Sequence, residues 1–451
     1  MKSFKLQLWL IGCLAFLMSS CLGDDDEEYD DTYYSNCQIK SFSLSNDSIP
    51  GLKSVKFTID QVNGLIFNKD SMPYGTVIDE KVICKIDYVV SPLNVEIFQA
   101  ALKDSGYWNG SDSLDFSDYV RFEVHSLNGK AIKRYIAQLN IHQVLPDSMS
   151  WSLHTSELTG QKYQDQKVII RNGKYWMYIK DSNGYRLYQS SNTMNWTESD
   201  LTGLDEGAFI LSQIVDYEGV LYLPADKGLL YFSMNGTDWA VLEGTLEVKT
   251  LLGVVYESEQ LKLPSALAAV VSDNGKLCYG VMDKAQSWKT GAEIADGFPI
   301  AGFGYLSHEV RFYQRLMVLA GKDRNGQLSN VAWETMDGLE WIKMTDERSS
   351  YFDKREGIAL TKYDGCFYFF GGIDASNKAR KDIYRSESKG LTWELVDTLI
   401  TFPDAYKARG YSSVFVDEDN FILLFGGKES TTANMFDELW AGRINRLGFK
   451  D

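Results

Sequence analysis

The sequence predicts an all-β fold, in which an immunoglobulin-like β-sandwich is followed by a six-bladed β-propeller. The first reason is a repeat of six tryptophans that return every 43 to 53 residues, the length of one four-stranded propeller blade. The second is composition: 13% of the residues are aromatic, only 8 are proline, and no long segment has a 3.6-residue apolar period. The six tryptophans are Trp151, Trp196, Trp239, Trp288, Trp341 and Trp393.

Each predicted blade also contains a short, almost continuously apolar run, as expected of a strand that neighbouring blades cover on both faces. Six such runs occur, at residues 174–179, 220–223, 266–271, 316–320, 366–370 and 421–425. The last three end in Ala320-Gly321, Gly371-Gly372 and Gly426-Gly427, which resemble the glycine pair of kelch blades. The runs therefore agree with the tryptophans on six blades.

The offset between these two repeats predicts how the ring closes. Trp151 has no blade strands directly ahead of it, whereas the last strand set ends at residues 439–442 with no phased tryptophan behind it. We expect the segment around Trp151 to supply the outer strand of the last blade, because that pairing removes an open sheet edge. The predicted propeller spans residues 149–451.

Residues 1–20 are predicted to be a targeting signal rather than part of the fold. Lys2 and Lys5 form a basic start, and residues 6–17 form an apolar segment too short to cross a membrane. The next four residues, ending in Cys21, resemble a bacterial lipobox, whose cysteine is acylated and becomes the new N-terminus. We expect lipidation at Cys21, and an ordinary secretory signal with a chance cysteine is the alternative.

Residues 21–36 are predicted to be a solvated acidic tether. Five consecutive acids, Asp24 to Glu28, are followed by Asp30 and Asp31, and such a run is too charged to fold. The run resembles the acidic signal by which Bacteroidota move lipoproteins to the outer leaflet, and a plain spacer is the alternative. Because the net charge of the chain is −17, we expect no nucleic-acid partner and contact with a membrane only through the lipid.

Residues 37–148 are predicted to form the immunoglobulin-like sandwich, from about seven short runs of alternating apolar residues. The clearest runs are residues 53–59, 81–86, 119–124 and 135–141. Residues 94–104 are predicted to form one short helix. Cys37 and Cys84 share this domain, and both a disulfide between them and two free thiols remain open.

The sequence contains little of the usual catalytic machinery. Only four histidines occur, and none are paired at zinc-ligand spacing, so we expect no metal site and no cofactor. No Gly-x-Ser-x-Gly motif is present for a serine hydrolase. The sequence therefore assigns no catalytic residue.

Candidate ligand-binding residues fall near the starts of the innermost strands expected in the last three blades. Arg355 and Arg409 lie 16 and 17 residues ahead of their glycine pairs, and they have two interpretations: contact with a ligand, or hydrogen bonds to blade carbonyls around the channel. Tyr305, Tyr351 and Tyr411 fall nearby, where they would rim a funnel for a sugar or a peptide or else pack the blades. Ligand is expected on the face with the longest loops, residues 322–330, 373–382 and 428–437.

The loops before the later tryptophans resemble degenerate Asp-boxes, the Ser/Thr-x-Asp-x-Gly-x-x-Trp hairpins of sialidase-like propellers. The clearest copies are residues 233–239 and 335–341. In such a hairpin Asp or Asn accepts backbone N–H groups and Gly supplies a positive φ. The resemblance suggests sialidase-like activity, but the early Arg-Ile-Pro of those enzymes is absent.

From the lipobox to the last blade, the chain resembles an uncharacterised family of Bacteroidota surface lipoproteins with an immunoglobulin-like N-terminal domain and a kelch- or Asp-box-like six-bladed propeller. Residues 61–68 (QVNGLIFN) and 70–75 (DSMPYG) carry this resemblance most specifically. That family has no assigned activity, so the resemblance implies only architecture and location. The location it implies is the bacterial outer membrane, with a lipid anchor and an outward-facing chain.

These observations favour a monomeric surface protein with a non-catalytic binding or scaffolding role, whose partner is a glycan or a protein. The alternative is a sialidase-like or other glycoside-acting enzyme. An enzyme of that kind would need two carboxyl groups at the channel mouth with the separation that glycosidases use.

Overall fold

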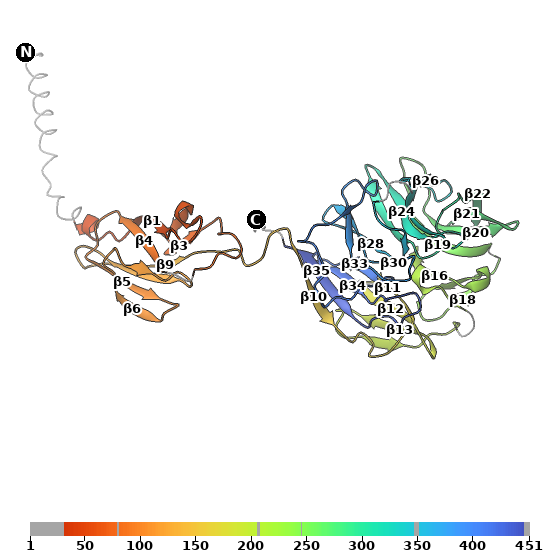
Figure 1. The fold of residues 1–451 in the computed structure, drawn as a ribbon, viewed down its shortest axis with the longest axis horizontal. Helices are drawn as coiled ribbons and strands as arrows, with labels where there is room; N and C mark the ends of the chain where they lie inside the picture. Colours follow the sequence, from red (N-terminus) through yellow and green to blue (C-terminus); the bar gives the residue numbers. More distant parts are fainter. Residues whose placement is uncertain (1–30, 79–80, 205–207, 245, 347–350, 446–451) are drawn as a thin grey trace, which may run out of the picture. The chain divides into compact units, whose positions relative to one another are not determined.

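The computed structural model describes residues 31–78, 81–204, 208–244, 246–346 and 351–445. The chain divides into two compact units, Met1–Pro146 and Asp147–Asp451 (Figure 1). Both are built from β-strands, and short 3-10 turns occur at Leu52–Ser54 (η1), Leu211–Gln213 (η2) and Asp226–Gly228 (η3). The targeting signal, Cys21 and the acidic run from Asp24 to Asp30 lie outside the described residues.

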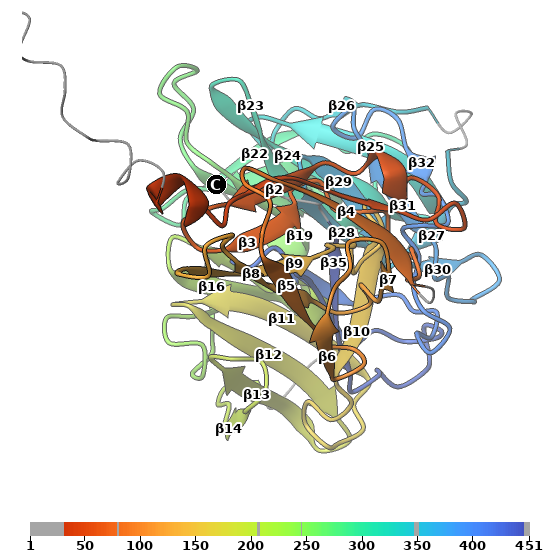
Figure 2. The same cartoon turned by 90° about the vertical axis from the view of Figure 1, so that its left-hand side faces the viewer.

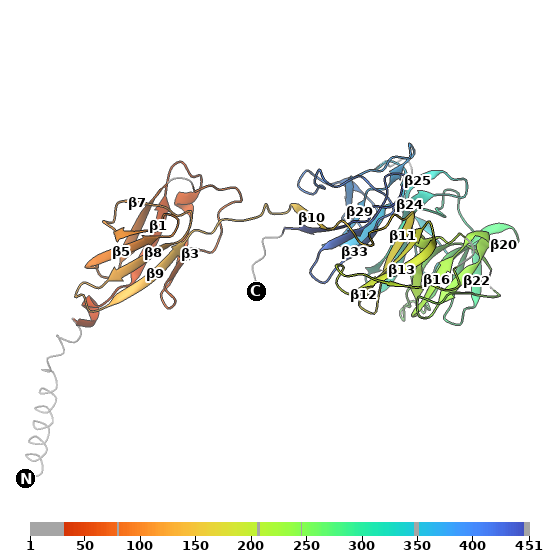
Figure 3. The same cartoon turned by 90° about the horizontal axis from the view of Figure 1, so that it is seen from below.

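The N-terminal unit is a sandwich of two sheets. One sheet has the order β1-β4-β7, and the other has the order β2-β3-β9-β8-β5-β6. Figure 3 shows β1 and β7 beside β3, β5, β8 and β9. The strands are β1 (Ile39–Ser45), β2 (Phe57–Asp60), β3 (Leu65–Asn68), β4 (Val82–Tyr88), β5 (Asn94–Gln99), β6 (Asp104–Tyr107), β7 (Ser113–Leu114), β8 (Val120–His125) and β9 (Ile132–Gln138). Side chains from both sheets, such as Phe42, Val82, Phe122 and Tyr135, meet in one buried core.

The structure corrects one expectation about this unit and decides between two alternatives that the sequence left open. The helix predicted over residues 94–104 is wrong: the segment forms β5 and β6, and β5 pairs with β8 so that Val95 lies opposite Val124. The local sequence could not show this pairing, because β8 lies more than twenty residues further along the chain. Cys37 and Cys84 do not form a disulfide; both are buried free thiols, and burial raises the pKa of Cys84 far above its usual range.

The C-terminal unit is a six-bladed propeller, since its described residues form six four-stranded sheets. Figure 2 shows the strands of blade one side by side. Blade one contains β11 (Asp165–Arg171), β12 (Lys174–Asp181), β13 (Gly184–Ser190) and β14 (Thr197–Ser199). Blade two contains β15 (Val215–Tyr217), β16 (Val220–Pro224), β17 (Leu230–Ser233) and β18 (Ala240–Val241). Blade three contains β19 (Glu247–Val255), β20 (Ala266–Asp273), β21 (Lys276–Met282) and β22 (Trp288–Glu293).

The second half of the ring repeats the plan with one addition. Blade four contains β23 (Gly304–Val310), β24 (Tyr313–Lys322), β25 (Leu328–Thr335) and β26 (Ile342–Lys343). Blade five contains β28 (Ala359–Tyr363), β29 (Cys366–Phe370), β31 (Ile383–Ser386) and β32 (Glu394–Leu395), and a small extra sheet pairs β27 (Arg355–Glu356) with β30 (Ile373–Asp374). Blade six contains β33 (Ser413–Val416), β34 (Ile422–Phe425), β35 (Leu439–Ile444) and β10 (Met149–Thr155).

The ring closes in blade six, where the first strand of the propeller pairs with its last. β10 runs antiparallel to β35, with Trp151 opposite Gly442. The indole of Trp151 lies on Gly442 so closely that a Cβ there would come within 2.4 Å of the ring, so only glycine allows the contact. The expected closure, with an outer strand donated by the segment around Trp151, is therefore confirmed.

The second strand of each blade is buried on both faces, as the apolar runs predicted. Met177 and Ile179 of β12 pack against Leu423 and Phe425 of β34, which joins blade one to blade six. Because contacts of this kind recur between neighbouring blades around the ring, the packing of each blade depends on its two neighbours.

Tight hairpin loops between the two outer strands fix the phased tryptophans. In blade four, Gly338 N–H donates to Thr335 Oγ1 at 2.8 Å, and Asp337 Oδ1 accepts the backbone N–H of Leu339 at 2.9 Å. The indole of Trp341 then donates to the carbonyl of Gly338 at 3.2 Å. The indoles of Trp196 and Trp393 donate the same type of bond to the carbonyls of Thr193 and Gly390. The tryptophans therefore recur because the same hairpin recurs in these blades.

Removing β10 tests the closure. A chain of residues 156–451 should melt well below a chain of residues 143–451, or aggregate, because it lacks Trp151 and exposes the edge of β35. Loss of a fully buried tryptophan costs about 3–5 kcal/mol, and Trp151 is partly buried, so its own contribution is smaller. Thermal unfolding followed by circular dichroism measures the difference, and equal melting temperatures for the two chains would contradict the role of β10.

Candidate functional site

The long loops of the last three blades open on the same face as the segments that lead into the innermost strands. The start of each innermost strand pairs with the end of the second strand: Gly304 with Leu319, Ala359 with Phe370, and Ser413 with Phe425. The loops after the second strands are therefore next to these segments. We call this side of the propeller the entry face.

Three segments on the entry face are bonded in series around the propeller axis. The N–H of Gly357 donates to the carbonyl of Gly302, and the N–H of Tyr411 donates to the carbonyl of Gly357, both at 2.6 Å. All three residues have a positive φ, of 62°, 68° and 62° for Gly302, Gly357 and Tyr411. Tyrosine rarely adopts this conformation, which costs roughly 1–2 kcal/mol. Tyr411 thus occupies, under strain, a position that is glycine in the two preceding blades.

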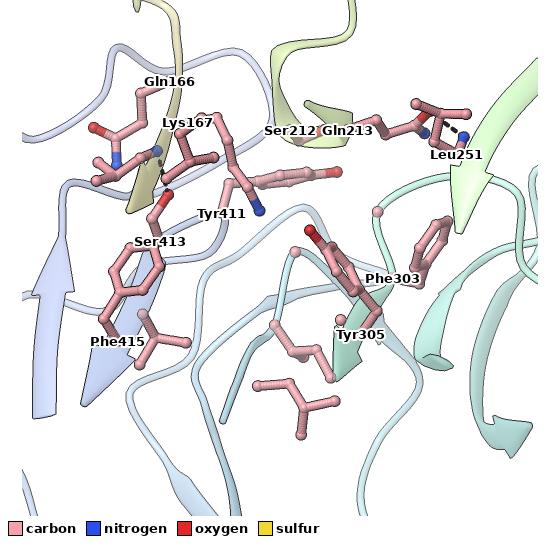
Figure 4. A pocket seen from close by; sticks show the side chains of 18 of the residues that line it. Gln166, Lys167, Ser212, Gln213, Leu251, Phe303, Tyr305, Tyr411, Ser413 and Phe415 are labelled. Carbon is pink, nitrogen blue, oxygen red and sulfur yellow. Dashed lines mark hydrogen bonds between the residues drawn. The ribbon is translucent and has the colours of Figure 1, made fainter. Parts of the chain in front are cut away.

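Gly302, Gly357 and Tyr411 belong to the lining of an axial pocket of about 280 Å³ (Figure 4). All six blades or their entry segments contribute to its lining. The residues are Gln166, Lys167, Val168, Ile169, Ile170, Ser212, Gln213, Leu251, Gly302, Phe303, Gly304, Tyr305, Gly357, Ile358, Leu360, Tyr411, Ser413, Val414 and Phe415. The pocket is therefore a product of the whole ring and not of one blade.

Lys167, Tyr305 and Tyr411 form the polar centre of the axial pocket. Figure 4 shows their side chains directed into the same space from blades one, four and six. The ammonium of Lys167 lies 5.2 Å from the centroid of the Tyr305 ring, a cation–π distance. The centre of the pocket thus presents one cation and two tyrosine side chains to a ligand, and Phe303 and Phe415 add aromatic surface to the lining.

Tyr411 is held by a buried carboxylate. Its hydroxyl donates a short hydrogen bond to Glu356, and the other oxygen of Glu356 pairs with the Lys322 ammonium at 2.6 Å. Burial raises the pKa of the Tyr411 phenol far above its usual range, and the adjacent Glu356 charge raises it further. The phenol therefore stays protonated and fixed in direction at neutral pH.

Other polar lining groups join the blades to one another. Gln166 Nε2 donates to the carbonyl of Phe425 at 2.6 Å, Gln213 Oε1 accepts the N–H of Leu251 at 3.1 Å, and Ser413 Oγ accepts the N–H of Val168 at 3.0 Å. These bonds make the pocket rigid, because each one ties the wall of one blade to the next.

Arg355 and Arg409, predicted either to contact ligand or to bond blade carbonyls, do the second. Both are 1% exposed, and neither lines the axial pocket. Arg355 Nη1 donates to the Gly371 carbonyl at 3.1 Å and to Asp382 at 2.7 Å. Arg409 Nη1 donates to the Gly426 carbonyl at 2.9 Å, and its Nη2 donates to Glu438 at 2.9 Å. The structure does not support the ligand-binding interpretation, because these donors already have partners within the protein.

The three candidate tyrosines fall in two places. Tyr305 and Tyr411 line the axial pocket, whereas Tyr351 is 37% exposed and lies outside it. Sequence reasoning missed Lys167, Glu356 and Gln213. Lys167 directly precedes the apolar residues 168–170. Because charged residues are uncommon next to a buried strand segment, this position was a usable signal. No local signal could show that Glu356 reaches Tyr411, 55 residues away.

Within the described ranges, no group of three or more His, Cys, Asp or Glu side chains is arranged to hold a metal ion. A search of the same residues for a long apolar helix finds none that could cross a membrane.

These features define a β-propeller with a closed ring and a small pocket on its axis. The chain belongs to the DUF6242 family: its β-propeller domain matches residues 145–451, and its N-terminal domain, a domain of unknown function, matches residues 31–139.

No curated protein matches the chain. Among solved structures, one titled "Structure of YjhT" is 15% identical, with a TM-score of 0.42, over 62% of this chain and 95% of that one. A likeness at that TM-score carries no argument about this protein.

Replacing Arg409 with alanine tests its structural role. The variant should lose roughly 2–3 kcal/mol of unfolding free energy; breaking a fully buried pair costs about 3–5 kcal/mol, and Glu438 is partly exposed. Chemical denaturation measures this loss, and Lys381→Ala, at an exposed position, is the control that should unfold like the wild type. An Arg409→Ala protein of unchanged stability would contradict the structural assignment.

Proposed function

We propose that the propeller is a non-catalytic binding module whose axial pocket receives the end of a glycan. The observation that carries this proposal is the convergence of Tyr305, Tyr411 and Lys167 in one small concave pocket. Aromatic rings offer a flat apolar face to a sugar, and the few polar groups beside them fix its orientation.

The size of the pocket supports a glycan end over a folded protein surface. A cavity of about 280 Å³ suits one sugar ring, whereas protein partners usually bind over broad surfaces. The hydroxyl of Ser413 accepts a backbone bond and can still donate, so sugar hydroxyls would find a partner there.

The binding module is proposed to act on the outside of a bacterial outer membrane, as a lipid-anchored monomer. The lipobox ending at Cys21 and the acidic residues 24–31 support this location, by resemblance to Bacteroidota lipoproteins. In this arrangement the N-terminal sandwich serves as an immunoglobulin-like spacer that carries the propeller away from the lipid.

One observation favours a second candidate, a glycoside-acting enzyme. A tyrosine hydroxyl beside a carboxylate is a known form of glycosidase nucleophile, and Tyr411 donates to Glu356 at the pocket. The binding role remains the better supported of the two, because none of the described residues that line the axial pocket is an Asp or Glu able to act as the second carboxyl group.

Tyr305→Ala tests the binding site. Loss of the ring should weaken glycan binding by roughly two- to tenfold, because an aromatic contact contributes roughly 0.5–1.5 kcal/mol. Tyr351→Ala removes an aromatic side chain outside the pocket and should bind like the wild type. A glycan array followed by calorimetry on the bound members measures both variants.

Equal binding by the wild type and the Tyr305→Ala protein would contradict the axial site. If the wild type hydrolyses a bound glycan and both Tyr411→Phe and Glu356→Gln lose this activity, the protein is a glycoside-acting enzyme and not a binding module.

Cys21→Ala tests the anchor. The wild-type protein should require detergent for its extraction from membranes, since a multiply acylated N-terminus is held by roughly 0.8 kcal/mol per buried methylene. The variant should appear in the soluble fraction instead. Protease treatment of intact cells measures exposure separately, and digestion only after lysis would contradict the outward orientation.

A further inference from the structure

The axial pocket differs in charge from the rest of the protein. The chain has a net charge of −17, with 62 acidic and 45 basic residues. Among the described residues that line the pocket, none is Asp or Glu, and Lys167 is the one cationic residue. A partly enclosed cation in an acidic protein favours an anion, because charges in a confined site are screened less than charges on the surface.

The ammonium of Lys167 forms no ion pair within the described part of the chain. Among the described residues, no carboxylate lies within salt-bridge distance of it, and its ammonium lies 5.2 Å from the centroid of the Tyr305 ring. Lys322, near the mouth of the pocket, is by contrast paired with Glu356 at 2.6 Å. Lys167 therefore keeps its hydrogen-bonding capacity for a ligand.

The acidic groups Glu356 and Asp165, which belong to segments that line the pocket, have other partners. Glu356 is occupied by Lys322 and by the Tyr411 hydroxyl. Asp165, two residues before Lys167, accepts the N–H of Gln166. Burial raises the pKa of Asp165, while the charges of Lys428, Lys180 and Lys167 act in the opposite direction, so Asp165 interacts with Lys167 at a distance without forming an ion pair with it.

Resting on the binding role proposed above, we infer that the ligand carries a carboxylate that pairs with Lys167. The ligand class is then an acidic sugar at the end of a glycan, with its ring against Tyr305 and the apolar wall formed by Ile358 and Phe415. One ammonium matches one carboxylate. A phosphate dianion would call for a second cation or an arginine fork, and the pocket lining has neither.

A glycan array with matched members tests this inference. Each uronic acid-terminated oligosaccharide is paired with the neutral oligosaccharide of the same linkage. The wild-type protein should bind the acidic member at least tenfold more tightly, a difference typical of one charge-assisted hydrogen bond. Lys167→Met should abolish this preference.

Lys180→Met is the matched control. Lys180 belongs to the same blade and lies 5.3 Å from the Tyr185 ring, so this change removes the same charge and a similar cation–π contact outside the pocket. It should keep the wild-type preference. Equal binding of acidic and neutral members by the wild type would overturn the inference that a ligand carboxylate pairs with Lys167. An acidic preference that persists in Lys167→Met would do the same. Neither result would contradict glycan binding in the pocket.

Absence of binding to every glycan would contradict the proposed function instead, and acetate then tests the carboxylate site alone. In a methyl-labelled protein, acetate should shift the Ile358 methyl signals saturably in the wild type and in Lys180→Met, but not in Lys167→Met. Wild-type signals that do not respond to acetate would overturn the inference, whatever the glycan array shows.

Discussion

The propeller depends on the pairing of its first strand with its last. β10, at the start of the propeller sequence, is hydrogen-bonded to β35, near its end. Trp151 of β10 packs on Gly442, Phe370 and Phe402. This pairing turns six sheets into a ring and leaves no blade with an uncovered face at the junction. All six blades or their entry segments line the pocket on the axis, so the pocket forms only when the ring is closed. The geometry of the candidate site therefore depends on the pairing of β10 with β35.

The ring uses most of its inner polar groups for its own cohesion. Arg355 and Arg409 bind the carbonyls that end the second strands of blades five and six, and Gln166, Gln213 and Ser413 bond across blade boundaries. What remains free toward the axis is small: the Lys167 ammonium, the faces of Tyr305 and Tyr411, and a few hydroxyl groups. A function for the pocket must therefore be built from one cation and aromatic surface.

The blade count and the closure could be predicted because they repeat: each blade needs the same buried strand and the same tryptophan hairpin, so six weak signals add up. The site could not, because it depends on which way individual side chains leave the backbone. Arg355 and Arg409 are in the expected position but turn into the protein, whereas Lys167 turns into the pocket. The strand over residues 94–99 was missed for a related reason, since its partner β8 is distant in sequence.

The central claim is that the axis of this acidic propeller carries an available positive charge. Crystals soaked in sodium bromide and measured at the bromine absorption edge would locate bound anions directly. The account predicts an anomalous peak in the axial pocket at ion-pair distance from the ammonium of Lys167. Peaks confined to lysines outside the pocket, such as Lys180, would contradict it, because the pocket would then attract anions no better than the rest of the surface.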